Sequence, residues 1–174
     1  NLNYLGRDVY KCSPKLDFYT LSCAGGILGC TMILNNQLVE CIKKKSPPTK
    51  IVMHDFYISV LCKYLGGEIL YDNYCSLKYR QHGNNVIGVA HGKSNIIINR
   101  FKFITRKKKI SISNQSNELL KYNSDLNYKN WAESIAKYRN NLYRRILLSF
   151  SLKTRYVNLN MSLKMRLAIL LGNR

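Results

Sequence analysis

Apolar residues recur at helical spacing in several parts of the chain. After Asn35 or Asn36, which can cap a helix, Leu38, Cys41 and Ile42 fall on one face. A second apolar face begins just after His54-Asp55 and ends before Gly66-Gly67, and it consists of Phe56, Val60 and Tyr64 with Tyr57 and Leu61. The spacing predicts a helix in each place, with Asp55 at the amino terminus of the second helix.

The carboxyl-terminal part has a longer helical pattern. One face of a long amphipathic helix is predicted from Trp131, Ile135, Tyr138, Leu142, Ile146 and Phe150. A short basic helix follows over 162–171, with Gly172 just past its end. Residues 111–117 are polar and are predicted to form a loop.

Strands are predicted where apolar runs are short or alternate. The run Thr31-Met32-Ile33-Leu34 is typical of a short buried strand. Residues 69–71 are followed by the turn Asp72-Asn73 and by an alternating segment over 75–80. Together with the helices, these segments predict an α/β protein with a small mixed sheet.

Asp55 is the residue with the clearest chemical potential, and two interpretations compete for it. An aspartate at a helix amino terminus often only caps the helix or interacts with its dipole. A carboxylate beside His54 can also act as a general base. The glycines that precede residue 31 have a similar pair of interpretations, either turn geometry or close approach of the backbone to a ligand.

Three blocks, taken in order, resemble a known family. They are Gly29-Cys30-Thr31-Met32, then Met53-His54-Asp55-Phe56, then the string from Tyr79 to Gly88, which reads Tyr-Arg-Gln-His-Gly-Asn-Asn-Val-Ile-Gly. Together they resemble the carboxyl-terminal half of a family 2 glycosyltransferase of the GT-A type, close to rhamnosyltransferase-like enzymes of bacterial surface polysaccharide synthesis. The resemblance implies that 1–100 are the acceptor side of the catalytic domain and that 101–174 form a basic helical tail.

The resemblance assigns roles to individual residues. It implies that Asp55 is the general base of an inverting transfer from a nucleotide-sugar to a saccharide or lipid-linked saccharide acceptor. Arg80, Gln81 and His82 match the stretch near the leaving diphosphate, where cations stabilise developing negative charge. Gly29, Cys30, Thr31, His54 and Asn85 are implied to border the donor and acceptor pocket. This chain has His54 where many relatives have an acidic residue.

The family's amino-terminal half is expected to lie outside this chain. That half carries an Asp-x-Asp motif for the nucleotide and metal, and no Asp-x-Asp occurs here. The complete enzyme is therefore expected to use a divalent metal, Mg or Mn, that this chain does not bind alone. A fragment of this kind is expected to be inactive by itself.

Charge introduces other candidate partners. Residues 1–75 contain 8 Lys/Arg and 6 Asp/Glu, a net charge of +2, whereas 76–174 contain 20 and 3, a net charge of +17. Such a field favours anionic partners, so a basic nucleic-acid-binding module is the alternative function. The charge does not explain the His-Asp and Tyr-Arg-Gln-His blocks, and no nucleic-acid partner is expected. The basic tail is also compatible with an anionic membrane surface.

Cysteine usage and hydropathy suggest a location for the protein. The six cysteines include no Cys-x-x-Cys pair, so metal-site spacing is absent, and reduced thiols are expected. No apolar run has the length of a membrane-spanning helix, and no leader follows Asn1. The expected location is cytoplasmic, with peripheral contact at the inner face of the cell membrane.

Overall fold

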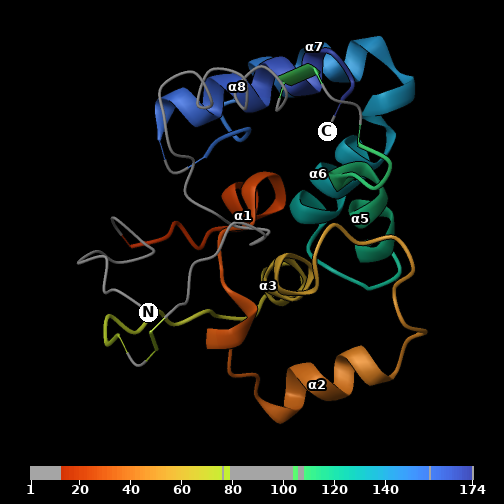
Figure 1. Cartoon of the computed structure of the whole chain (residues 1–174). Helices are drawn as coiled ribbons and strands as arrows, with labels where there is room; N and C mark the ends of the chain where they lie inside the picture. The colour runs from red at the N-terminus through yellow and green to blue at the C-terminus, as the bar shows by residue number, and fades with distance from the viewer. Residues whose placement is uncertain (1–12, 76, 79–103, 106–107, 157, 174) are drawn as a thin grey trace.

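The computed structural model describes residues 13–75, 77–78, 104–105, 108–156 and 158–173. Those residues fold into helices joined by loops, and they contain no strand, so the predicted α/β class with a small mixed sheet is wrong (Figure 1). The predicted boundary at residue 100 lies outside the described residues.

Side-chain caps begin the two amino-terminal helices, of which only the second was predicted from the sequence. Helix α1 (Phe18–Ala24) begins after Asp17, whose carboxylate accepts from the Thr20 amide. Helix α2 (Asn36–Lys43) begins after Asn35, which accepts from the Leu38 amide. A side-chain acceptor at this position pairs one of the amides that the first turn leaves without an intrahelical partner.

Helix α3 (His54–Tyr64) provides a large part of the core. Val60, Leu61 and Tyr64 are fully buried, as the periodicity predicts. The helix ends before Gly66, whose φ of +80° is a conformation that glycine adopts readily. Asp55 lies in its first turn, so the predicted helix and the predicted place of Asp55 on it are confirmed.

Two of the strand predictions fall on described residues and are wrong. Thr31 ends a short 3-10 helix, η1 (Gly29–Thr31), and the chain then runs extended to α2 without pairing with another described segment. Ile33 is 98% exposed, so this apolar run is not a buried strand. Residues 69–71 are also irregular, and the alternating segment over 75–80 lies only partly within the described residues.

Helix α5 (Ile112–Leu119) replaces the loop that the polar composition of 111–117 predicts. Ser111 and Asn114 form a capping box at its start. Its polar side chains are buried with partners: the Ser113 hydroxyl donates to the Ala136 carbonyl, and Gln115 accepts from the Val52 amide. Buried polar groups are tolerated when they are hydrogen-bonded, so a polar helix can lie inside this protein.

The long helix predicted over 131–150 is interrupted. Helix α6 (Leu126–Lys137) passes through the 3-10 turn η2 (Tyr138–Asn140) and is followed by α7 (Leu142–Phe150), which Asn141 caps. The last helix, α8 (Leu159–Leu170), begins earlier than predicted and ends before Gly172, whose φ is +72°.

One hydrophobic core joins the two parts of the chain. Phe18 of α1 stacks on Tyr128 of α6 with ring centroids 4.4 Å apart. Trp131 of α6 donates its indole N–H to the Ser22 hydroxyl at 2.9 Å. Helices α7 and α8 lie side by side above α1 and α6 in Figure 1, and they add Leu148, Met165 and Ile169 to the same core. None of the described helices combines the length and apolar character needed to cross a bilayer.

Candidate functional site

The Asp55 site, formed by Gly29, His54 and Asp55, joins two segments that are distant in the sequence. The Gly29 amide donates to Asp55 Oδ2 at 3.1 Å, across a separation of 26 residues. The Phe56 amide donates to Asp55 Oδ1 at 2.7 Å. The carboxylate therefore links η1 to the amino terminus of α3, where the helix dipole favours negative charge.

The carboxylate retains room for another hydrogen bond. Each carboxylate oxygen has about two lone-pair sites, and the backbone amides use one on each oxygen. Asp55 is buried, with 5% of its surface exposed. No described Lys or Arg forms an ion pair with it. Each oxygen of Asp55 therefore keeps a further acceptor site.

Gly29 is constrained by its neighbours and not by its backbone angle. A Cβ atom at this position would lie 2.6 Å from His54 Nε2 and 3.3 Å from the Asp55 Cβ. The first distance is shorter than real side-chain contacts, so a larger residue would displace the His54 ring. The exposed imidazole thus lies against the Gly29 backbone, beside the carboxylate.

Helix α5 holds the loop that leads into α3. Glu118 accepts from the Thr49 hydroxyl at 3.3 Å, and Gln115 accepts from the Val52 amide at 3.2 Å. Burial raises the pKa of Glu118, but the hydrogen bonds and charge of Lys121 and the bonds from Thr49 outweigh it, so the pKa is lowered overall. These contacts fix the position at which α3, and with it Asp55, begins.

The sequence did not predict that α5 holds the loop before α3. Glu118 and Gln115 are three residues apart and so share a helix face, but only a prediction of helix over 112–119 could have revealed that.

The other predicted site residues divide into two groups. Cys30 and Thr31 are exposed on η1, next to Gly29, and the Thr31 hydroxyl donates to the Leu28 carbonyl at 2.9 Å. The structure thus brings the first two blocks of the predicted site together. Arg80, Gln81, His82 and Asn85 lie outside the described residues.

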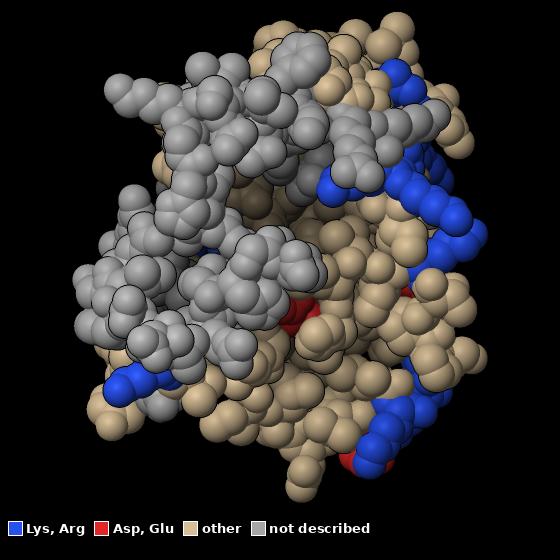
Figure 2. All heavy atoms as spheres, viewed as in Figure 1, with Lys and Arg blue, Asp and Glu red and all other residues tan. Residues whose placement is uncertain are grey.

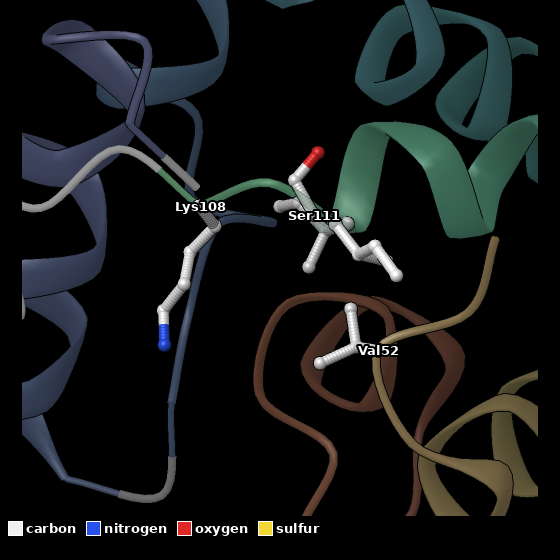
Figure 3. Close-up of a pocket in the computed structure, with 5 residues that line it drawn as sticks. Val52, Lys108 and Ser111 are labelled. Carbon is white, nitrogen blue, oxygen red and sulfur yellow. The ribbon is translucent and has the colours of Figure 1, made fainter.

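A small pocket lies between the loop before α3 and the segment that enters α5. It is lined by Val52, Lys108, Ile110, Ser111 and Ile112. In Figure 3 the Val52 side chain points toward the segment of Ser111, while the Lys108 side chain extends away from it. The lining is mostly apolar and contains no carboxylate or imidazole, so the pocket has no group that could act as a general base near neutral pH.

Lys and Arg side chains border a largely uncharged middle on one side of the face shown in Figure 2. Figure 2 shows blue Lys and Arg side chains along one side of this face, with uncharged residues and a small acidic area in its hollowed centre. In the described part of the chain, no three His, Cys, Asp or Glu side chains are grouped to hold a metal ion. No family model, curated protein or solved structure matches this chain.

Proposed function

We propose that Asp55 is the general base of a glycosyl transfer from a nucleotide-sugar to a saccharide acceptor. The observation that carries the proposal is the fixed carboxylate: two backbone amides orient it, and it keeps acceptor sites free. The sequence blocks of Gly29 and His54-Asp55, which resemble the glycosyltransferase motifs, meet at this point. The reaction is proposed without the mixed sheet that the resemblance implied, because the described residues contain no strand.

In the proposed reaction the acceptor hydroxyl donates its hydrogen bond to Asp55. The hydroxyl oxygen forms a bond to the anomeric carbon as the bond from that carbon to the diphosphate oxygen breaks. The proton passes to the carboxylate, and the nucleoside diphosphate leaves with the electron pair. Because attack comes from the face opposite the leaving group, the anomeric configuration inverts. An alcohol is a poor nucleophile near neutral pH, so a positioned base contributes about 10²–10⁴-fold.

Other residues have proposed supporting roles. The exposed His54 ring lies beside Asp55 and can hydrogen-bond a sugar hydroxyl. Arg80 and His82 retain their predicted role of stabilising charge on the leaving diphosphate. The described residues do not fit the Mg or Mn site that a complete enzyme is expected to have.

The reaction can be tested with the polypeptide that contains this chain together with any preceding segment. It would be incubated with a panel of nucleoside-diphosphate sugars, with and without saccharide and lipid-linked acceptors. We expect acceptor-dependent release of the nucleoside diphosphate, with proton NMR showing an inverted anomeric centre in the product. Retention of configuration, or no transfer with any pair, would contradict the proposal.

The net charge of +17 on 76–174 supports a second candidate, a basic nucleic-acid-binding module. Fluorescence anisotropy with labelled RNA and DNA at several salt concentrations distinguishes the two. Tight, sequence-selective binding in the absence of glycosyl transfer would favour the second candidate.

A further inference from the structure

Helix α7 exposes an apolar face. Leu142, Tyr143, Ile146, Leu147 and Phe150 fall on one side of the helix, and their exposed fractions run from 42% for Ile146 to 76% for Phe150. Leu148, on the opposite side, is buried, as is Ser149 at the edge of this face. The second half of the apolar face predicted over 131–150 therefore lies at the surface, beyond the break at η2.

Helix α8 is apolar on two sides. Met165, Ala168 and Ile169 are buried in the core. Leu159, Leu163 and Leu167 follow one another at four-residue spacing on the other side and are 74%, 48% and 49% exposed. A helix that is apolar all round normally has both sides covered, so its exposed side suggests a missing partner.

The two helices pack against each other, and each exposes apolar side chains. The Ser149 hydroxyl donates to the Arg166 carbonyl at 3.0 Å, and the Arg166 guanidinium donates to the Ser151 carbonyl at 3.1 Å. Both helices bury the opposite side in the same core, so both exposed sides are on the outside of the molecule. We call this surface the hairpin face; it consists of Leu142, Tyr143, Ile146, Leu147, Phe150, Leu152, Leu159, Leu163, Leu167 and Leu171.

The stretch of sequence that carries the hairpin face has charged residues of one sign only. Residues 134–174 contain nine Lys/Arg and no Asp or Glu. Arg145 and Arg166 donate to backbone carbonyls, which hold their guanidinium groups in place without neutralising them. Arg155 is different, because it pairs with Asp17 at 2.9 Å.

We propose that the hairpin face docks on an anionic lipid bilayer, with α7 and α8 lying in the plane of the interface. Apolar side chains would enter the boundary between headgroups and acyl chains, while the Lys and Arg stems reach toward lipid phosphates. Charge selects this occupant over a second copy of the chain. Two copies that met through this face would bring two uniformly positive segments together, whereas an anionic bilayer neutralises them. This inference does not depend on the proposed glycosyl transfer.

Vesicle sedimentation with the full 174-residue chain tests the proposal. Vesicles of phosphatidylcholine alone would be compared with vesicles containing phosphatidylglycerol, at low and high salt. We expect binding to the anionic vesicles only, and weaker binding as salt screens the charges. The double variant Leu163→Ser with Leu167→Ser should lower the partition coefficient by about tenfold or more, because apolar area drives insertion.

A matched control is available in the same chain. Leu70 and Leu126 are also exposed leucines, 85% and 69% respectively, outside the hairpin face. Leu70→Ser with Leu126→Ser should leave vesicle binding unchanged. Circular dichroism of both double variants confirms that they are folded.

A spectroscopic readout locates the contact. Trp131 is the single tryptophan of the chain and is buried, so its fluorescence gives a constant background. Leu163→Trp should show a blue-shifted emission with anionic vesicles, and Leu126→Trp should not.

The proposal is overturned if both double variants bind vesicles equally, or if the wild type binds neither kind of vesicle. It is also overturned if sedimentation velocity shows a dimer that Leu163→Ser with Leu167→Ser converts to a monomer while no vesicle binding occurs. Salt-sensitive binding to RNA, without binding to anionic vesicles, would likewise reject the bilayer as the occupant.

Discussion

Removing the hydroxyl group should change the stability of the fold in opposite directions for two tyrosines on α3. Tyr64 is fully buried, and its hydroxyl has no hydrogen-bond partner among the described residues. Tyr57, also buried, shares a hydrogen bond with Tyr122. Burial raises the pKa of both phenols, so both are neutral at pH 7 and neither substitution removes a charge.

The magnitudes follow from the cost of an unpaired buried polar group. An unsatisfied hydroxyl costs about 1–3 kcal/mol in desolvation, whereas a satisfied one contributes about 1 kcal/mol. Tyr64→Phe should therefore raise the free energy of unfolding by about 1 kcal/mol, and Tyr57→Phe should lower it by about 1 kcal/mol. For a chain of this size the corresponding shifts in Tm are about 2–4 °C, upward and downward.

Urea unfolding followed by circular dichroism at 222 nm measures both variants against the wild type, and thermal scans provide the second estimate. Equal m values would show that the change lies in stability and not in the extent of unfolding. A loss of 1 kcal/mol or more in Tyr64→Phe would refute the reasoning, because it would reveal a hydrogen bond of that hydroxyl.

Two further predictions concern the support of the Asp55 site. Gly29→Ala should lower the free energy of unfolding by about 1–3 kcal/mol through overpacking, and combining it with His54→Ala should recover part of that loss; additive losses in urea unfolding would contradict the proposed contact. Because the pKa of Glu118 is lowered in the folded state, its stabilising contribution is present above its ordinary pKa of 4.5 and is lost as pH falls below it. Glu118→Gln should therefore show a smaller loss of stability between pH 5 and pH 3 than the wild type, and an unchanged acid dependence would reject this role.

The sequence predicts local structure well where the caps and the apolar period agree. Asn35 with the spacing of α2, and Phe56 to Tyr64 with the glycines after them, place two helices correctly. The failure at α5 has a different cause, because Ser113 and Gln115 are buried through partners that are distant in the sequence. Polar composition alone cannot reveal those partners.

Other errors came from tertiary structure overriding a local pattern. The apolar run Thr31–Leu34 lacks a neighbouring strand, and pairing cannot be determined from one segment. The period over 131–150 is continuous, yet the chain turns at Tyr138–Asn140, so the first half of the apolar face is buried and the second half is exposed. Apolar periodicity shows which residues share a face but not what that face contacts.

The candidate site could be predicted only in part. The amino-terminal place of Asp55 follows from the helix pattern. Its bond to the Gly29 amide, 26 residues away, does not follow from any local rule, and only the resemblance grouped these residues.

The central claim is that Asp55 acts as a base, and a single-turnover measurement with Asp55→Asn tests it most directly. Asn cannot take the acceptor's proton, so the transfer rate should fall by about 10²–10⁴-fold, or about 3–5 kcal/mol in barrier. Stability should fall by only about 1–3 kcal/mol, because the Asn NH₂ group cannot accept from the Gly29 amide. Asp72→Asn, at an exposed turn aspartate, is the matched control and should transfer at the wild-type rate. Near-normal transfer by a folded Asp55→Asn enzyme would contradict the account and leave Asp55 as a purely structural link between η1 and α3.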